Sequence, residues 1–182
     1  MTTYPALSLT ETQTLIALRA FLLSILPAGT EVVRGLDNRV PEPIGANFVV
    51  MTPVLRARLE TNVVAFQDNY PVSAGLRTDL QPIRLTVQLD VHGPLAADNT
   101  QVITTLWRSE WATIQFAASG YDVTPLYAEE PKQLPYLNGE QQVEIRWVID
   151  AVMQTNPTVT TTQDFAASLV AGVIDVDAEY QP

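Results

Sequence analysis

Apolar residues recur along the chain at two spacings, which predict helices in some segments and strands in others. Near the N-terminus the spacing is that of one helix face, formed by Leu15, Leu18, Leu22 and Ile25. Ser8 and Glu11 form an S-x-x-E capping box just before this run. The pattern predicts a helix from about residue 8 to residue 26, because the Pro-Ala-Gly sequence at 27–29 cannot continue it.

This helix also carries apolar residues outside its main stripe, among them Phe21 and Leu23. A helix that is apolar nearly all round is buried on more than one side. Two explanations remain open. The helix fills the core of its own domain, or part of its surface packs against a neighbouring subunit, in which case Phe21 and Leu23 are candidate interface residues.

The segment 83–93 shows the clearest strand pattern. Apolar residues alternate with polar ones, so that one face of the strand carries Ile83, Leu85, Val87, Leu89 and Val91. The other face carries Arg84, Thr86, Gln88, Asp90 and His92, and we expect it to be solvated. One buried and one solvated face is typical of an antiparallel sheet.

Further strands are predicted at 30–35, from Phe48 to about Phe66, and at 142–152. Within the second of these, Pro53 indicates a bulge or an edge position, because proline cannot donate a hydrogen bond to a central ladder. The segment 67–79 is polar and long for a hairpin connection, which favours a functional loop.

A second helix is predicted over residues 94–120, ended by Gly120. Its apolar stripe consists of Ile103, Trp107, Trp111, Ile114 and Ala118. The element order therefore predicts an α+β fold, in which two helices pack on one face of an antiparallel sheet and extended loops and a C-terminal segment complete the chain. We expect one domain over residues 1–155 and an acidic strand or arm over residues 156–182.

Charge and composition narrow the function. The chain of 182 residues has 20 acidic and 10 basic residues, for a net charge of −10. This balance is unfavourable for a protein that binds nucleic acid by neutralising phosphates. It fits either simple solubility or the lining of a channel through which nucleic acid passes. The N-terminus has no signal-peptide pattern, and the apolar run at 15–26 is too short to span a membrane.

Groups that could carry chemistry are sparse. The absence of cysteine excludes disulfides, zinc–thiolate and iron–sulfur sites and a thiol nucleophile. Asp90 and His92 form a conceivable catalytic pair, but a nucleophile would have to come from Ser73 or Thr86, and neither lies in a nucleophile-elbow pattern. The paired carboxylates at 129–130 read as a solvated loop, and the acids near the C-terminus as a tail. We predict no catalytic residue, no cofactor and no metal.

The stretch RGLDNRVPEPIGANFVVMTP, residues 34–53, combines a stiff loop with an apolar strand. Pro41 and Pro43 lack N–H donors, and each disfavours helical geometry in the residue before it. The loop is therefore expected to be extended and exposed, presenting Arg39 and Glu42.

This stretch resembles the segment G-x-x-N-R-V-P-x-P-x-G…F-V-V-M-T-P of tail terminators (tail-completion proteins), a family of neck proteins of tailed bacteriophages. The matching positions are Gly35, Asn38, Arg39, Val40, Pro41, Pro43, Gly45, Phe48, Val49, Val50, Met51, Thr52 and Pro53. The predicted helices and strands follow in a compatible order over about residues 5–155. The acidic C-terminal segment has no recognisable counterpart.

The resemblance implies a tail-terminator-like α+β fold and a structural role without chemistry. Such proteins form a homo-oligomeric ring, usually a hexamer, that caps the head-proximal end of the tail tube. The partners implied are the tube, in contractile tails also the sheath protein, and the head-side collar or connector protein, while DNA passes through the ring without sequence-specific binding. The location implied is the virion neck, after assembly in the host bacterial cytoplasm, with no membrane partner.

Two site hypotheses follow. The first assigns a docking role to the loop residues Asn38, Arg39, Pro41, Glu42 and Pro43, against the alternative that the loop only routes the chain into the strand at Phe48. The second places acidic residues at the lumen: Asp175, Asp177 and Glu179. Three other function classes remain open: a head-side collar or connector protein, a monomeric binding module, and a hydrolase that uses Asp90 and His92.

Overall fold

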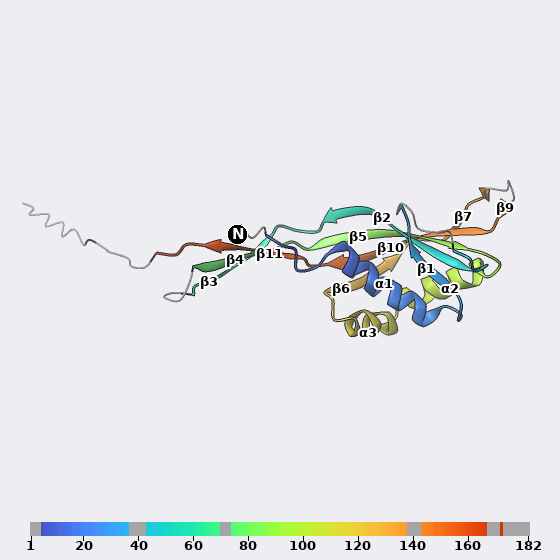
Figure 1. Cartoon of the computed structure of the whole chain (residues 1–182), viewed down its shortest axis with the longest axis horizontal. Helices are drawn as coiled ribbons and strands as arrows, with labels where there is room; N and C mark the ends of the chain where they lie inside the picture. The colour runs from blue at the N-terminus through green and yellow to red at the C-terminus, as the bar shows by residue number, and fades with distance from the viewer. Residues whose placement is uncertain (1–4, 37–42, 70–73, 138–142, 167–171, 173–182) are drawn as a thin grey trace, which may run out of the picture.

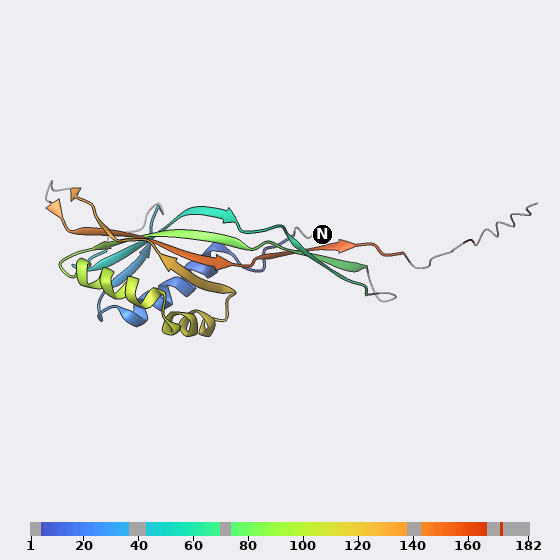
Figure 2. The same cartoon turned by 180° about the vertical axis from the view of Figure 1, so that it is seen from behind.

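The computed structural model describes residues 5–36, 43–69, 74–137, 143–166 and 172. Two regions are visible in Figure 1: a body, in which helices cover one face of a sheet, and a slender arm of strands that extends away from it. The view from behind in Figure 2 shows the same division. The α+β class predicted from the sequence is confirmed.

The body is built on a sheet whose main path has the order β1-β2-β5-β10-β6. These strands are β1 (Glu31–Arg34), β2 (Phe48–Arg58), β5 (Ile83–His92), β10 (Arg146–Thr155) and β6 (Val123–Ala128), with the short β7 (Lys132–Gln133) also paired to β10. Every pair is antiparallel except β1 and β2, which run parallel with Glu31 opposite Phe48. The loop between β1 and β2 thus returns the chain to the end of the sheet where β1 began.

Of the two alternatives predicted at Pro53, a bulge or an edge position, the structure shows the bulge. The pairing of β2 with β5 shifts register between Pro53 and Leu55. A bulge accommodates proline in a central strand because the extra residue is left out of the hydrogen-bond ladder. After this point the side chains of β2 become exposed, from Val54 to Arg56.

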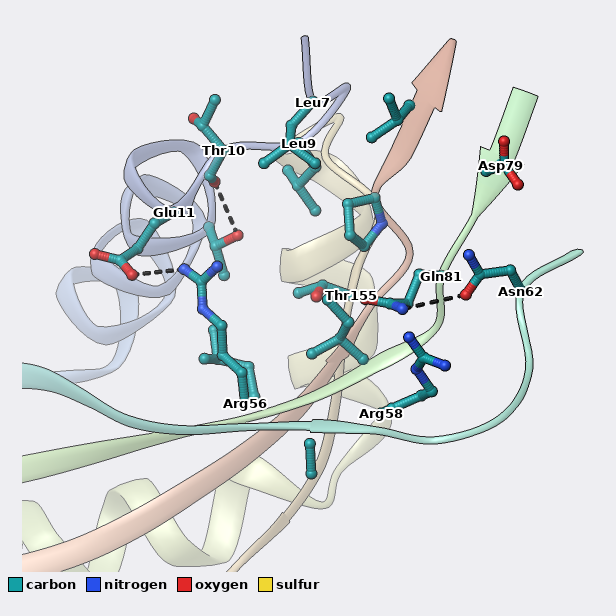
Figure 3. A pocket seen from close by; sticks show the side chains of 16 residues that line it. Leu7, Leu9, Thr10, Glu11, Arg56, Arg58, Asn62, Asp79, Gln81 and Thr155 are labelled. Carbon is teal, nitrogen blue, oxygen red and sulfur yellow. Dashed lines mark hydrogen bonds and ion pairs between the residues drawn. The ribbon is translucent and has the colours of Figure 1, made fainter. Parts of the chain in front are cut away.

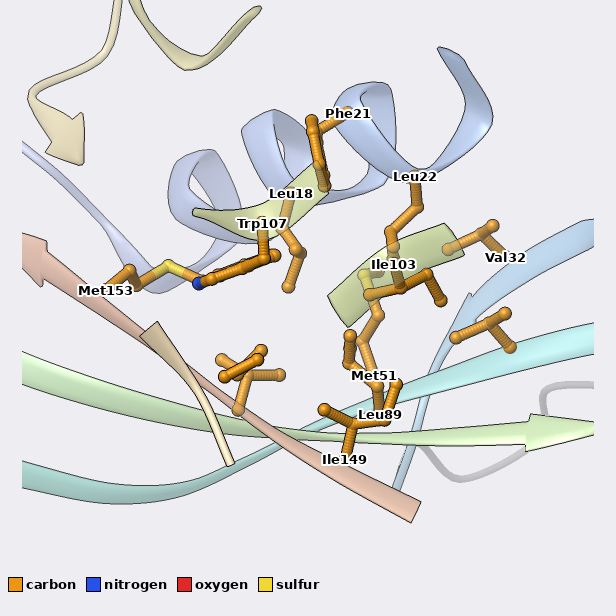
Figure 4. Packing of buried hydrophobic residues seen from close by; sticks show 14 of the residues in the cluster. Leu18, Phe21, Leu22, Val32, Met51, Leu89, Ile103, Trp107, Ile149 and Met153 are labelled. Atoms are coloured by element: carbon orange, nitrogen blue, oxygen red, sulfur yellow. The ribbon is translucent and has the colours of Figure 1, made fainter. Parts of the chain in front are cut away.

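The helices are α1 (Glu11–Ile25), α2 (Ala96–Trp107) and α3 (Glu110–Ala118), and all of them lie on the same face of the sheet (Figures 1 and 2). Figure 4 shows Leu18, Phe21 and Leu22 of α1 pointing toward residues of α2 and the sheet. Trp107 at the centre is fully buried, and its indole N–H donates to the carbonyl of Val152 at 3.2 Å.

The start of α1 differs from the sequence prediction. Thr10 is the N-cap, and the capping box is formed with Gln13: Thr10 Oγ1 accepts from the Gln13 N–H at 3.3 Å, and Gln13 Oε1 accepts from the Thr10 N–H at 2.8 Å. The S-x-x-E pattern at Ser8 was a competing signal. Ser8 is used elsewhere, because its Oγ accepts from the N–H of Thr158 at 2.9 Å.

The single helix predicted over 94–120 is also wrong. It breaks at Arg108 and Ser109, and Ser109 caps α3 by accepting from the Ala112 N–H at 3.4 Å. The break changes the helical phase, so that Phe116 is buried while two residues of the expected stripe, Trp111 and Ile114, are about half exposed. The described chain therefore has three helices on the sheet where two were expected.

The arm is a three-stranded antiparallel sheet in the order β11-β4-β3. Its strands are β3 (Val63–Gln67), β4 (Gly75–Leu80) and β11 (Thr158–Gln163). The strand predicted from Phe48 to Phe66 is thus divided between the body and the arm, and residues 75–79 of the loop expected at 67–79 belong to β4. A further hairpin, β8 (Tyr136–Leu137) and β9 (Val143–Glu144), precedes β10. No described helix is long and apolar enough to span a membrane.

Candidate docking site

Six of the thirteen residues that carry the family resemblance line one cavity at the end of the body sheet. This cavity, which we call the motif cavity, has a volume of about 690 Å³. Six motif positions lie in its wall: Gly35, Pro43, Gly45, Phe48, Val50 and Thr52. The rest of the lining comes from the ends of β5 and β10 and from neighbouring loop residues, including Asp90, His92 and Arg146.

A partly buried ion pair lies in the wall of the motif cavity. Arg146 donates to Asp90 Oδ1 from Nη2 at 2.6 Å and from Nε at 3.0 Å. The Nε2 of Gln88 donates to both oxygens of the same carboxylate at 3.0 Å. Because the Asp90 carboxylate accepts from both side chains, it is held in one orientation.

The expectation that Asp90 and His92 lie on a solvated face is wrong. Their exposed fractions are 7% and 6%. Alternation along β5 describes the direction of each side chain, but the loop before β2 and the start of β10 cover that end of the face. Arg84, Thr86 and Gln88, farther along the same face, are half-buried.

His92 stacks on Phe48, with the ring centroids 4.5 Å apart and the planes 9° from parallel. Burial lowers the pKa of His92, and the positive charge of Arg146 adds to this effect, whereas Asp90 and Glu144 oppose it. The imidazole is therefore neutral at pH 7. Among the described residues that line the cavity, Thr52 alone has a hydroxyl group. With Asp90 held by Arg146 and Gln88, this arrangement favours a structural role for the pair over a hydrolytic one.

Both ends of the loop between β1 and β2 are fixed to the body. The Gly35 N–H donates to the Met51 carbonyl at 2.8 Å, and the Gly45 N–H donates to Glu31 Oε1 at 2.7 Å. Gly93 has φ +101°, and a Cβ there would lie 1.9 Å from the Ala46 carbonyl oxygen. Only glycine permits this approach. The described flanks of the loop are thus held in place on the rim of the cavity.

The predicted site residues fall into three groups: one that lines the motif cavity, those outside the described residues, and those on α1. Pro43 lines the motif cavity. The other loop candidates, Asn38, Arg39, Pro41 and Glu42, lie outside the described residues, as do the lumen candidates Asp175, Asp177 and Glu179.

The two candidate interface residues of α1 differ in exposure. Leu23 is 41% exposed on the surface of α1. Phe21 is 1% exposed and lies in the core, with its ring 5.3 Å from Phe116 and 5.5 Å from Trp107. The prediction of Phe21 as an interface residue is therefore wrong. Its side chain fills the core of its own subunit, as the alternative reading of this helix allowed.

A second cavity, of about 410 Å³, lies where the arm joins the body (Figure 3). Its lining comes from residues far apart in the sequence, including Leu7, Glu11, Arg56, Arg58, Asp79 and Pro157. Glu11 accepts from Arg34 Nη2 at 2.6 Å and from Arg56 Nη2 at 2.5 Å. Sequence reasoning missed this cavity, because no local pattern connects residue 11 with the end of β2.

The sequence model of one protein family, described as phage neck terminator protein, matches residues 13–178. The chain belongs to the phage neck terminator protein family. The resemblance to tail terminators that we found from the motif is thereby confirmed. The match also reaches well beyond residue 155, so it includes most of the C-terminal segment for which the motif gave no counterpart. No curated protein matches the chain.

This neck terminator is accordingly a structural protein of a bacteriophage, located in the neck of the virion. Among the described residues, no cluster of three or more histidine, aspartate or glutamate side chains could hold a metal ion. The functional question for such a protein is which of its surfaces contact other virion proteins.

Proposed function

We propose that this neck terminator forms a homo-oligomeric ring that caps the head-proximal end of the tail tube and joins it to the head-side connector. The observation that carries the proposal is the convergence of the family motif on one cavity. Six motif positions, distributed over 18 residues of sequence, line its wall together with the partly buried Asp90–Arg146 pair. A motif that forms one preorganised surface is well suited to docking a partner at low entropic cost.

The loop centred on Arg39 is the docking element in this proposal. The described flanks of the loop are pinned by Glu31 and Met51, so its central residues are presented from a fixed base. Arg39 contacts a carboxylate of a neighbouring subunit or of a tail protein. The tube protein is the primary partner, and in a contractile tail the sheath protein is a further one.

Ring contacts are supported by apolar side chains on the helical layer. Ile16 and Leu23 of α1 and Trp111 and Ile114 of α3 are each between 41% and 53% exposed. Apolar groups at this level of exposure on a structural protein favour contact with another subunit. A hexamer is the stoichiometry that the resemblance implies.

DNA passes through the lumen in this proposal without sequence-specific binding. The net charge of −10 supports the proposal, because an acidic wall repels phosphates and limits adhesion. Asp175, Asp177 and Glu179 are the candidate lumen residues. Replacing all three by the corresponding amides is expected to slow DNA ejection, and unchanged ejection kinetics would remove the lumen assignment.

Native mass measurement followed by imaging of the particle tests the ring directly. The expected result is a closed ring that binds tube protein. A monomer at high concentration by light scattering would contradict it and favour a monomeric binding module. A ring that binds the portal side but not the tube would instead identify a head-side collar protein.

The Arg39→Glu variant tests the docking element. The expected result is loss of tube binding and of infectivity, because the charge of the docking residue is reversed. Arg39→Lys is the matched control, because it changes the same side chain and keeps its positive charge. Unchanged assembly and infectivity of Arg39→Glu would leave the loop with the role of chain routing alone.

A further inference from the structure

The arm is a sheet without a covering layer. In the body, the helices cover one face of the sheet, whereas no described helix packs on β3, β4 or β11 (Figures 1 and 2). All residues of β3 are exposed, including Val63 at 56% and Phe66 at 60%. A small sheet of this kind has little stability of its own unless another surface packs on it or extends it.

Among the described residues, no further strand pairs with the β3 edge of the arm, and the β11 edge is only partly occupied. β3 pairs with β4 alone, and β11 pairs with β4 on one side. On its other side, only the beginning of β11 is occupied, by a bridge from Leu7 to Val159 and a backbone hydrogen bond from the Ser8 N–H to the Thr158 carbonyl at 2.9 Å. From Thr160 to Gln163 the outer edge of β11 is open to another strand.

The charge pattern of the arm is unusual for exposed edges. Neither Val63–Gln67 nor Thr158–Gln163 contains a charged residue or a proline. The charges of the three strands are confined to the central strand, where Arg77 and Asp79 pair with each other at 2.8 Å. Proteins ordinarily protect exposed edges with charges, particularly lysine, or with proline. These two edges lack that protection, which indicates that strand pairing is their purpose.

We propose that the edge of β3 in one copy pairs with the outer edge of β11 in the next copy. The occupant is a second copy of this chain because each copy carries two uncharged edges, one on either side of its arm, and the β3 edge of one copy can pair with the β11 edge of another. Two copies with a net charge of −10 each repel one another, and the neutral edges of the arm let backbones approach with little added repulsion. Each copy offers one edge of each kind on opposite sides of its arm, so the contact is head-to-tail and generates a ring if the rotation closes.

This inference rests on the proposed ring and specifies how its subunits are joined. β3 and β11 are both antiparallel to β4, so they run parallel to each other. A neighbouring β3 laid beside β11 with the two arms in the same direction forms a parallel pair. The arms then join into one continuous sheet around the particle.

Engineered cysteines provide the test, because the chain has none of its own. Ala65, Thr78 and Thr160 lie opposite one another across the arm. Within one subunit, Ala65 and Thr160 are therefore two strand spacings apart, about 9.6 Å. This separation is too large for a disulfide, which needs Cα atoms within about 7 Å. Any disulfide between these positions must join two copies.

The full-length variants are A65C/T160C and A65C/T162C, two pairs that cover registers differing by two residues on the same face. Under mild oxidation, at least one is expected to give a ladder of covalent oligomers on a denaturing gel, ending at the ring number. The single variants A65C, T160C and T162C are expected to give no ladder. A covalent dimer from A65C alone would indicate symmetric pairing of two β3 edges and would overturn the head-to-tail contact.

The outcomes separate this inference from the proposed function. If native mass measurement finds rings but neither double variant gives a ladder, the arm contact is overturned and the ring stands. If the chain is monomeric under all conditions, both are overturned. As a second readout, A65K is expected to raise the dissociation constant of the ring at least tenfold with unchanged circular dichroism, while T124K, at an exposed position of β6 in the body, leaves it unchanged. Equal effects of the two would also overturn the arm contact.

Discussion

The body and the arm use the same kind of strand in opposite ways. In the body, the alternating apolar residues of β5 pack beneath α1 and α2, and those at Val87, Leu89 and Val91 are fully buried. In the arm, four of the five residues of β3 are apolar, yet the strand is wholly exposed. The comparison shows that the fate of an apolar strand is decided by what covers it. The body is stabilised within one chain, whereas the arm, in our proposal, is completed by contact with another copy.

The largest effect on stability is expected from replacing one phenylalanine by alanine in each region. Phe21→Ala removes a fully buried ring from the core and is expected to lower the free energy of unfolding by about 4 kcal/mol. Phe66→Ala in the arm is expected to lower it by less than about 1 kcal/mol, because the side chain is already 60% exposed. Chemical denaturation of the unassembled chain measures both values. Similar losses for the two variants would contradict the division into a self-sufficient body and a dependent arm.

The ion pairs of the two regions provide the next comparison. Arg146→Met leaves the buried carboxylate of Asp90 without its cation and is expected to cost about 3 kcal/mol. Arg77→Met removes the corresponding partner of Asp79 in the arm, where solvent screens the pair, and no measurable change in the midpoint of unfolding is expected. Denaturant titration at low ionic strength checks both. A larger effect at Arg77 would mean that the arm is stabilised internally.

Two glycines with positive φ test how firmly the loop is held at the motif cavity. A Cβ at Gly93 would overlap the Ala46 carbonyl oxygen, and Gly93→Ala is expected to cost about 2 kcal/mol, mostly by displacing the loop. Gly120, with φ +73°, has open space around it, so Gly120→Ala is expected to cost about 1 kcal/mol from backbone strain alone. Thermal unfolding measures the difference. Binding to tube protein should weaken only for the Gly93 variant.

The smallest effect is a pH dependence confined to the body. The pKa of His92 is lowered below its usual value of 6.5 by burial, so the unfolded chain binds the proton more tightly than the folded chain. Its contribution to stability is full above pH 6.5 and is lost as the pH falls through the lowered folded pKa. His92→Gln should therefore reduce the loss of stability between pH 7.5 and pH 5. Unfolding curves at the two pH values measure this, and parallel losses in both proteins would refute it.

Sequence patterns predicted the structural features that depend on residues close to one another in the sequence. The stripe on α1, the alternation of β5 and the bulge at Pro53 were each encoded within a few residues. The break at Ser109 was missed because the apolar residues keep a helical spacing in the sequence on both sides of it. Its capping hydroxyl was the local signal that could have revealed the break.

The candidate site depended on contacts between distant parts of the chain. Asp90 is buried beside Arg146, which lies 56 residues later in the sequence and pairs with it from the adjacent strand β10. No period along β5 contains that information. The motif residues were identified from their resemblance to a family, but their convergence on one cavity required the structure. The arm was missed for a related reason: strand propensity does not indicate which strands pair or whether anything covers them.

The contact between Ser8 and Thr158 joins residues 150 positions apart. During synthesis on the ribosome, all strands and helices of the body emerge before β11, which begins at residue 158. The body can therefore fold while β4 still lacks one neighbour, and until β11 emerges the nascent chain carries the two-stranded hairpin of β3 and β4 in place of the three-stranded arm. Closure of the arm by β11, secured by the segment around Ser8, thus follows synthesis of the whole body, and the outer edge of β11 proposed for assembly is presented only after the body has been made.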